Sequence, residues 1–487
     1  MDHAHIAYLK VIGSQLRGPI RAAAPDRMAT YLIDCSFAML TRMVVEHEQG
    51  EALRTALIKT LADNHEALQS VLGAAADGRA LLADIAQLST STSSHAQIDA
   101  VAARTAAFLI GGSSAESQRL ASLLVNTDAD NWQRVREAVN SLRAAAAGGV
   151  ERETEPMTAE EQQRLLELLR RECAESASLS ISHVGAIPGG YSKQTIIVTL
   201  SNNRVLPREI VVRRDRAESP VGSSVVDELA LLQLVHDCGI RVPKPWALDR
   251  GAVMGNPIIV MSKVEGRTIS EVYDVHEPDE RCALDLAEQL AILHRIPSDR
   301  VLRARPDMPG LEVSNIDYMR QQLEEYTAHW RTVGEPSVTM DASAAWMATH
   351  LDWAETAKVL VHRDPRFHNI LCENGHITAL LDWELAMFSH PARDLGWSYH
   401  QVIQMTDWKT FIAHYLKCGG VACSPESLAF YALWSDWYCA IQMYRARHLF
   451  HAGKAPFAYA FAGEEMRQAN VHSVASLLRR IVTVGRL

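Results

Sequence analysis

Apolar residues in the first 147 positions recur at the spacing of amphipathic α-helices. This stretch is rich in alanine and leucine, and it holds only two of the eighteen prolines. Five leucines fall near one face of a helix or helix pair: Leu53, Leu57, Leu61, Leu68 and Leu72. We therefore predict a separate all-helical domain over residues 1–147, with a role in packing or in forming a homo-oligomer.

The helical pattern ends at Gly148-Gly149, which a charged stretch follows. Paired glycines and charged residues between periodic segments are typical of a linker, so we predict a linker over residues 148–156. A new helix begins beyond it, because Thr158 and Glu161 have the spacing of a capping box. Removal of residues 1–148 is expected to leave a part that folds by itself.

From about residue 181 the apolar positions alternate with polar ones, as they do in half-buried strands. Strands are predicted at 195–200, 210–212 and 257–261, with a helix at 225–236. Beyond residue 265 the pattern is mostly helical, at 279–296, 316–331, 343–353 and from 408 onward. The chain is therefore predicted to be an α+β protein with a β-rich part, residues 157–264, and a larger helical part, residues 265–487.

The composition narrows the class of protein. A chain of 487 residues, 48% of them hydrophobic, is long enough for two or three domains. Its net charge of −10 and pI of about 6.1 argue against a nucleic-acid-binding protein, which carries basic patches. The N-terminus lacks the pattern of a signal peptide, no apolar run has the length of a membrane span, and the eight cysteines form no C-x-x-C pair. We expect a cytoplasmic protein without membrane or nucleic-acid partners.

The strongest chemical signal lies in residues 362–384. Asp364 and Asn369 stand five residues apart, as in the catalytic loop of protein kinases, where a second aspartate downstream holds Mg²⁺. Asp364 can accept the proton of a substrate hydroxyl, while His362 is expected to brace the loop through hydrogen bonds. Asn369 and Asp382 can offer an amide and a carboxylate oxygen to Mg²⁺, which needs few protein ligands.

A predicted β-hairpin explains how these groups meet. The apolar run 370–372 leads to Asn374-Gly375, a strong signal for a two-residue turn, and alternating apolar residues follow. A hairpin folded at this turn brings Asn369 and Asp382 to the same open end. The sequence therefore predicts a Mg²⁺ site beside Asp364.

Residues that could bind a nucleotide come earlier in the chain. A glycine-containing loop, residues 189–192, precedes a strand, so Ser192 and Lys193 could approach phosphate, although an exposed lysine is the commoner outcome in such a loop. Arg213 ends the next strand and is expected to contact phosphate, with Glu228 as its partner and Arg214 as the substitute.

The buried strand at 257–261 leads into a segment with the position of a hinge. Met261, Ser262 and Val264 are the candidates for adenine binding there, Ser262 and Val264 through main-chain atoms. A small β-rich lobe, a hinge and a larger helical lobe that carries the catalytic hairpin make up the predicted two-lobed, protein-kinase-like fold.

These motifs give the chain from about 180 to 450 a resemblance to the aminoglycoside/choline-kinase-like phosphotransferases, in particular to the kinase-like domains fused to some acyl-CoA dehydrogenases. The D-W-E segment at Asp382 and the P-x-x-D-L segment at Asp394 are the specific matches. The family pattern implies that Asp394 braces the catalytic loop. Family members usually have glycine at the position of Arg363, and the D-F-G and A-P-E segments of protein kinases are missing here, so a protein substrate is disfavoured.

The motifs and the resemblance together imply an ATP- and Mg²⁺-dependent kinase that phosphorylates a hydroxyl of a small molecule. Arg363 and Arg366 flank Asp364, and we expect them to repel a polycation and to favour an anionic acceptor such as a hydroxyacyl-CoA, with Arg366 as a catalytic residue. Internal pairing of Arg363 with Asp394 or Glu384 is the alternative for that residue. A pseudokinase that regulates a partner, or an aminoglycoside/choline-type antibiotic or metabolite kinase, is the alternative function.

Overall fold

The computed structural model describes the greater part of the chain. Apart from isolated positions near both ends, it comprises residues 27–88, 93–144, 157–187, 193–215, 224–271, 274–355, 358–452 and 466–485. The predicted linker, the boundary at residue 147 and the candidate Ser192 lie outside the described residues. Among the described helices, none combines the length and apolar character that a bilayer crossing requires.

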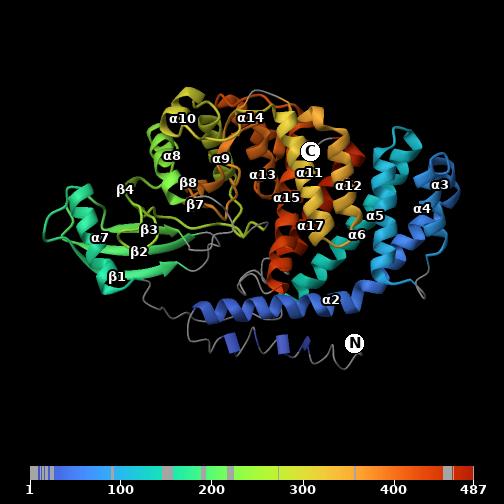
Figure 1. The fold of residues 1–487 in the computed structure, drawn as a ribbon, viewed down its shortest axis with the longest axis horizontal. Helices are drawn as coiled ribbons and strands as arrows, with labels where there is room; N and C mark the ends of the chain where they lie inside the picture. Colours follow the sequence, from blue (N-terminus) through green and yellow to red (C-terminus); the bar gives the residue numbers. More distant parts are fainter. Residues whose placement is uncertain are drawn as a thin grey trace.

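The N-terminal part is helical, as predicted. It contains α2 (Arg27–Asp63), α3 (His65–Leu72), α4 (Ala76–Ala86), α5 (His95–Gly111) and α6 (Ala115–Ala144). The long helix α2 runs along one edge of the molecule, and α3 to α5 gather at the end opposite the sheet (Figure 1). Ser94 begins α5 by accepting a hydrogen bond from the main-chain N–H of Gln97.

A five-stranded antiparallel sheet follows, with the strand order β1-β2-β3-β5-β4. Its strands and flanking helices are α7 (Ala159–Glu172), β1 (Ser180–Ile187), β2 (Lys193–Ser201), β3 (Glu209–Asp215), α8 (Val225–Asp237), β4 (Pro245–Asp249) and β5 (Ile258–Ser262). The predicted capping box of α7 is confirmed, because Thr158 and Glu161 each bond the other's main-chain N–H. Helix α7 packs on β1 and β4, whereas α8 packs on β3, β4 and β5.

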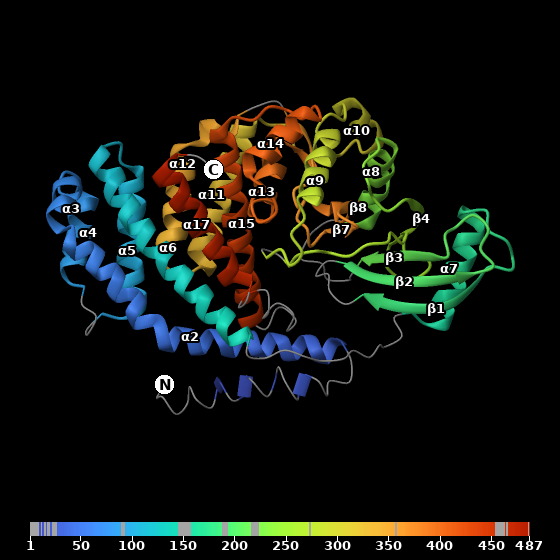
Figure 2. The ribbon, with the colours of Figure 1, turned by 180° about the vertical axis from the view of Figure 1, so that it is seen from behind.

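The remaining chain is mostly helical. Its helices are α9 (Glu280–Leu293), α10 (Ser298–Ala304), α11 (Asn315–Val333), α12 (Val338–Thr349), η2 (Leu351–Ala354), η3 (Trp383–Leu385), α13 (Ala392–Val402), α14 (Trp408–Lys417), α15 (Pro425–His451) and α17 (Arg467–Val484). Two small antiparallel pairs complete it, β6 (Val359–Val361) with β9 (Met387–Ser389) and β7 (Ile370–Glu373) with β8 (His376–Leu380). The helices of this C-terminal part lie between the five-stranded sheet and helices α3 to α5 (Figure 2).

Helix α13 approaches α15 very closely at Gly396. A Cβ atom at this position would lie 2.6 Å from the main-chain nitrogen of Ala432, so only glycine permits the contact without a shift of one helix. Helix α13 also carries Asp394, which binds main-chain N–H groups of the loop that precedes β7. The distance between α13 and α15 therefore affects the position of this loop.

The N-terminal helices do not form a separate hydrophobic core, which corrects the prediction of a separate domain. Leu57, Leu109 and Leu124 belong to one buried cluster together with Met340 and Leu478 of the C-terminal part. Helix α5 packs on α12, and α6 packs on α17. Helical periodicity indicated a buried face but could not show that residues more than 200 positions away cover it.

Buried polar contacts tie the same two parts together. The Asp128 carboxylate of α6 accepts hydrogen bonds from the main-chain N–H and the hydroxyl of Thr339, at 3.1 and 2.5 Å. Burial raises the pKa of Asp128 to about 6, although the bonds from Thr339 oppose this shift. Since a buried N–H without an acceptor costs about 1–3 kcal/mol, this contact supports the shared core.

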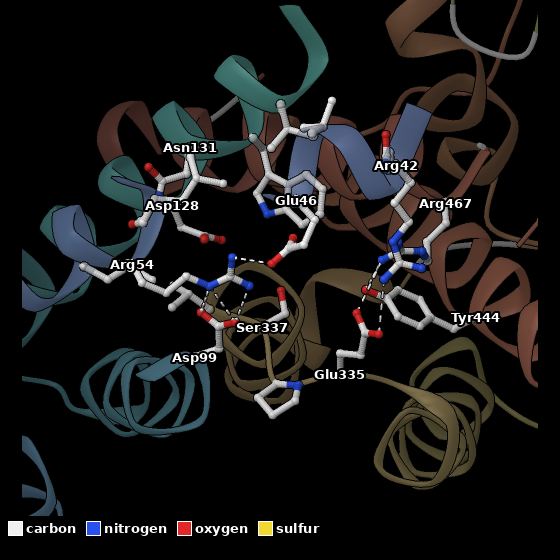
Figure 3. A pocket seen from close by; sticks show the side chains of 18 residues that line it. Arg42, Glu46, Arg54, Asp99, Asp128, Asn131, Glu335, Ser337, Tyr444 and Arg467 are labelled. Atoms are coloured by element: carbon white, nitrogen blue, oxygen red, sulfur yellow. Dashed lines mark hydrogen bonds and ion pairs between the residues drawn. The ribbon is translucent and has the colours of Figure 1, made fainter. Parts of the chain in front are cut away.

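A cavity of about 120 Å³, lined in part by charged side chains, lies at this junction, between α2, α5 and α6 on one side and residues 335–338 on the other. Figure 3 shows Arg42 of α2 and Arg467 of α17 converging on Glu335, at 3.3 and 3.6 Å. Burial would raise the pKa of Glu335, but Arg467, Arg42 and Arg447 outweigh it and lower the pKa to about 2. On the side of α2 and α5, Arg54 pairs with Asp99 over 2.8 Å, so charged side chains in this cavity are engaged in ion pairs.

Candidate active site

The predicted hairpin is confirmed. Strands β7 and β8 pair with Ile370 opposite Leu380, and Asn374 and Gly375 form the turn with φ angles of 52° and 80°. Two successive positive φ angles are those of the type I′ turn that Asn-Gly favours. At the open end, the Leu381 N–H donates to the Asn369 carbonyl over 2.8 Å. The hairpin therefore places Asn369 beside the chain that leads into Asp382.

Asp364 lies next to Asn369 and accepts two hydrogen bonds. The Asn369 amide donates to Asp364 Oδ2 over 2.8 Å, and the indole of Trp397 donates to Oδ1 over 2.7 Å. These two donors fix the orientation of the carboxylate. The amide oxygen of Asn369 has no hydrogen-bond partner among the described residues, and an oxygen of this kind is a suitable ligand for Mg²⁺.

Asp382 connects this hairpin to the sheet. It follows β8 in the left-handed conformation, with φ 66° and ψ 65°. Its Oδ1 atom accepts a hydrogen bond from Arg213 over 2.8 Å, and Arg213 also donates to Glu228 over 3.0 Å. Arg213 therefore pairs with Glu228, as expected, and additionally with the candidate metal ligand.

Strand geometry decides between the two adjacent arginines. Successive side chains of a strand point to opposite faces. Arg213 points to the face that carries Glu228 and Asp382, whereas Arg214 lies 3.7 Å from Glu161 of the α7 side. Arg213 is thus the arginine that the structure brings into the site.

Burial shifts the pKa values of Arg213 and Glu228 in opposite directions. Burial lowers the pKa of the Arg213 guanidinium, but Glu228 and Asp382 outweigh it and raise the pKa above its ordinary value. Burial raises the pKa of the Glu228 carboxyl, and Arg213 opposes that shift. The Oε1 atom of Glu228 is buried without a hydrogen-bond partner among the described residues, and Arg213 binds its other oxygen, Oε2, over 3.0 Å.

Lys193 is buried rather than exposed. Its side chain is 2% exposed, and its ammonium lies 3.2 Å from Asp215 and 3.5 Å from Glu384 of the D-W-E segment. The lysine therefore lies at the junction of the sheet with the catalytic hairpin. Burial between two carboxylates replaces the commoner outcome of an exposed loop lysine.

The predicted hinge follows β5. Met261 is buried, and Ser262 is held by its neighbours, because its N–H donates to the Lys244 carbonyl over 2.9 Å and its hydroxyl accepts from Trp246 over 2.7 Å. The main chain of Val264 makes no hydrogen bond with any described residue. Val264 is thus the hinge candidate whose N–H and C=O remain available to a ligand.

One face of α13 holds the catalytic loop. The Asp394 carboxylate accepts the main-chain N–H of His362 over 2.8 Å and of Arg363 over 2.7 Å. One turn further on is Trp397, which donates to Asp364, and the next turn presents Gln401, which accepts the N–H of Phe367. The expected bracing role of Asp394 is therefore present in the structure.

His362 braces the loop from the other side. Its Nδ1 atom accepts the N–H of Asp364 over 3.2 Å, and its Nε2 atom lies 3.0 Å from the Leu381 carbonyl. These two contacts fit a neutral imidazole that carries its proton on Nε2. His362 thus braces the catalytic loop through hydrogen bonds, as the sequence indicated, and also links it to the residue before Asp382.

Arg366 does not face an acceptor, which corrects its prediction as a catalytic residue. Its side chain is buried and donates to Asp436 of α15 over 2.7 Å and to the Trp397 carbonyl over 3.0 Å. The Asp436 carboxylate also accepts from Ser473 of α17. The arginine therefore anchors the loop in the helical core.

The side chain of Arg363, unlike that of Arg366, has no partner among the described residues. Its φ of 73° places it in the left-handed region, which explains why glycine is common at this position in the resembling family. Its guanidinium makes no ion pair or hydrogen bond with any described residue, so the suggested pairing with Asp394 or Glu384 is absent. Asp394 binds the main-chain N–H of Arg363 instead.

Sequence reasoning missed Trp397, Gln401 and Asp436. The spacing of Asp394, Trp397 and Gln401 is that of one helix face, so Trp397 and Gln401 could have been found once Asp394 was assigned to the loop. Asp436 left no comparable signal, because it lies 70 residues from Arg366 within a long apolar helix.

The fold and the site define a kinase-like phosphotransferase. The sequence model of the phosphotransferase enzyme family matches residues 183–431, about half of the chain, and the chain belongs to this family. The resemblance inferred from its motifs is therefore confirmed.

Curated relatives agree with this placement. Acyl-CoA dehydrogenase family member 11 of the rat is 27% identical over 187 residues, which are 36% of this chain and 23% of that protein. The chicken protein of the same name is 26% identical over 273 residues, 50% of this chain and 34% of that protein. Hygromycin-B 4-O-kinase of Escherichia coli is 32% identical over 100 residues, 20% and 27% of the two chains. The chain spans about a third or less of the length of these relatives.

A solved structure supports the fold. A provisionally named aminoglycoside phosphotransferase from Ralstonia eutropha superposes with a TM-score of 0.51 at 18% identity, covering 65% of this chain and 98% of that one. At this level of identity the likeness concerns the fold alone.

Proposed function

We propose that the protein is an ATP- and Mg²⁺-dependent kinase that transfers the γ-phosphoryl group to a hydroxyl of a small molecule. The observation that carries the proposal is the meeting of Asp364, Asn369 and Asp382 at the open end of one hairpin, with the Arg213–Glu228 pair against it. Phosphoryl transfer depends on positioning and charge stabilisation, and these residues supply both.

Asp364 is the proposed general base. Its carboxylate is held by Trp397 and Asn369, so it can orient the acceptor hydroxyl and take its proton as the O–P bond forms. Its side chain is 21% exposed, which leaves it accessible to a substrate.

The residues present fit a Mg²⁺ ion. Asn369 and Asp382 offer hard oxygen donors, and Mg²⁺ fills the rest of its shell with water and phosphate oxygens. When bound, the ion supplies positive charge across the phosphates. Arg213 already contacts one oxygen of Asp382, so the two residues hold each other in place before a nucleotide enters.

On this proposal the sheet acts as the nucleotide-binding lobe and the helical part as the second lobe. Val264 offers main-chain atoms to the adenine, and Met261 provides apolar surface beside it. Arg213 contributes a planar, permanently charged group to the phosphates, and Lys193 adds a second positive charge near Glu384. Ser192 retains its place as a candidate phosphate contact.

The proposal extends to the chemical class of the molecule that accepts the phosphoryl group. We propose an anionic hydroxy compound, with a hydroxyacyl-CoA as the leading case, because matched relatives are acyl-CoA dehydrogenase family members. Arg363 remains as the cation beside Asp364, while Arg366 is used internally. A polycationic aminoglycoside is disfavoured by the guanidinium of Arg363.

The proposal is tested by ADP release in the presence of Mg²⁺ and ATP, with hydroxyacyl-CoAs, free hydroxy acids, phenols, choline and aminoglycosides as acceptors. We expect turnover of anionic hydroxy compounds, with the phosphorylated product identified by mass. Nucleotide binding without ADP release from any acceptor would indicate a pseudokinase, and efficient turnover of aminoglycosides alone would replace the proposed acceptor class.

Substitutions of the two proposed metal ligands should weaken nucleotide binding to different extents. Asp382→Asn is expected to weaken Mg²⁺-dependent nucleotide binding more than Asn369→Ala, because a carboxylate offers the metal a full charge and an amide only a dipole. The measurement is nucleotide affinity by titration calorimetry with and without Mg²⁺. An equal loss for both variants that persists without Mg²⁺ would contradict the ligand roles, and Asp299→Asn, on the exposed surface of α10, is the matched control.

A further inference from the structure

Two guanidinium groups near the catalytic loop lack a counter-ion in the described part of the chain. Arg393 of α13 is fully buried, at 0% exposure, and neither it nor Arg363 forms an ion pair with any described residue. The Nε and Nη2 atoms of Arg393 have no hydrogen-bond partner, and its Nη1 atom reaches only the sulfur of Met319 at 3.8 Å. The Nε atom of Arg363 is likewise buried without a partner.

This arrangement is unusual on physical grounds. A buried charge is normally paired, since an unpaired one loses its hydration without compensation. The other buried cations near the catalytic loop follow this rule, because Arg366 pairs with Asp436 and Arg213 with Glu228. Arg393 has instead the ring of Tyr318, with 5.5 Å between its guanidinium carbon and the ring centroid. Such a contact compensates only part of the lost hydration.

The carboxylates nearest to the two arginines in the chain are already used. Both oxygens of Asp394 accept main-chain N–H groups of the catalytic loop, and Oδ2 also lies 3.2 Å from His294. The two oxygens of Asp364 are held by Trp397 and Asn369. An internal counter-ion for Arg363 and Arg393 is therefore absent among the described residues.

The two arginines lie close to each other, because Asp394, the residue after Arg393, accepts the main-chain N–H of Arg363 over 2.7 Å. Burial lowers the pKa of the Arg393 guanidinium, and the charge of Arg363 lowers it further. Arg393 packs on Tyr318 of α11, and Tyr326 of the same helix contacts Tyr438 of α15 edge to face, with 4.9 Å between the ring centroids. Since Arg363 directly precedes Asp364, the pair lies beside the group that is to receive the acceptor hydroxyl.

We propose that Arg363 and Arg393 form an oxyanion subsite that binds a carboxylate or phosphate group of the hydroxylated acceptor. The inference rests on the proposed kinase function and deepens it, because it assigns the residues that select an anionic acceptor. Guanidinium groups bind such oxyanions through paired N–H donors. The bound anion neutralises the two charges, and it fixes the acceptor so that its hydroxyl reaches Asp364.

The test uses matched probes in the full-length protein. 4-Hydroxybutyrate is compared with its methyl ester, and glycerol 3-phosphate with glycerol, so that the carboxylate and the phosphate are examined separately. Two quantities are measured, ADP release with Mg²⁺ and ATP, and the rise in unfolding temperature that each probe causes in protein saturated with Mg²⁺ and ADP. The variants are Arg393→Gln, Arg393→Lys and Arg363→Gly, with Arg303→Gln on the exposed face of α10 as the matched control.

We expect the anionic member of a pair to exceed its neutral counterpart by about 10–100-fold in kcat/KM, the value of hydrogen bonds to a charged group. Arg393→Gln and Arg363→Gly should remove this preference through a rise in KM that is far larger for the anionic probe than for the neutral one, while Arg393→Lys retains part of the preference. A structural role alone would change the turnover of both probes equally. Arg363→Gly relieves the left-handed backbone and remains informative if Arg393→Gln does not fold.

The outcomes separate the two proposals. Saturable stabilisation by an anion that the variants abolish, without phosphoryl transfer, would support the subsite and overturn the kinase function. Transfer to neutral and anionic probes at equal rates in all variants would overturn the subsite and support the kinase. Wild-type protein that neither binds nor discriminates either anion overturns the subsite directly.

Discussion

Replacement of Asp364 by Asn is expected to lower phosphoryl transfer by about 10²–10⁴-fold, the usual contribution of a general base. Nucleotide affinity should change little, because Arg213, Asp382 and the hinge are untouched. The substitution keeps the shape of the side chain, and its amide can still accept the hydrogen bond of Trp397. Single-turnover kinetics and nucleotide titration, performed on the same preparation, measure the two effects.

Asp299→Asn provides the control for Asp364→Asn, because it makes the same chemical change on the exposed surface of α10 and should retain full activity. A variant at position 364 that keeps more than about a tenth of the wild-type turnover would refute the assignment, since a lost base is worth at least ten times more than that. A large loss of nucleotide affinity would instead place Asp364 among the metal ligands.

Deletion of residues 1–148 is expected to prevent folding of the remainder to a soluble, cooperative state. The deletion removes the partners of α12 and α17 and exposes their buried faces. It also leaves the N–H of Thr339 without the Asp128 carboxylate. Removal of a single buried leucine costs about 2–5 kcal/mol, and this deletion removes many, against a total stability of about 5–15 kcal/mol.

Solubility, size-exclusion elution and thermal unfolding of the deletion protein check this expectation. Leu109→Ala, at a fully buried position of α5 in the shared core, is the milder form of the same change, and Leu416→Ala on the surface is its control. The first should lower stability by about 2–5 kcal/mol, and the second by no more than about 0.5 kcal/mol. A soluble deletion protein with the unfolding temperature of the full chain would show that the shared core is dispensable.

Local signals predicted the parts of the site that local geometry builds. Asn374-Gly375 requires two positive φ angles, which identifies the turn from two residues alone, and the turn then fixes how Asn369 and Asp382 approach. Arg213 and Glu228 were paired correctly because a strand end and the following helix are close in the chain. In each case the interacting residues are neighbours in sequence or belong to adjacent elements.

Residues whose partners are distant were misread. Arg363 and Arg366 look alike in the sequence, yet Asp436, 70 positions away, takes the side chain of Arg366 into the core. The N-terminal helices show the same limit, since Asp128 contacts Thr339 over a separation of 211 residues. Periodicity indicates which face of a helix is apolar but not which element covers it, and charge indicates no partner by itself.

The hold of α13 on the catalytic loop has a consequence for how this protein can diversify. Asp394 and Gln401 bind the loop through its main-chain N–H groups, which every non-proline residue possesses. The side chain at position 363 can therefore change, among residues that tolerate its left-handed backbone, while Asp364 keeps its place. On our proposal that side chain helps to choose the acceptor, so a descendant could change its substrate by exchanging Arg363 or the tyrosines of α11 without rebuilding the chemistry.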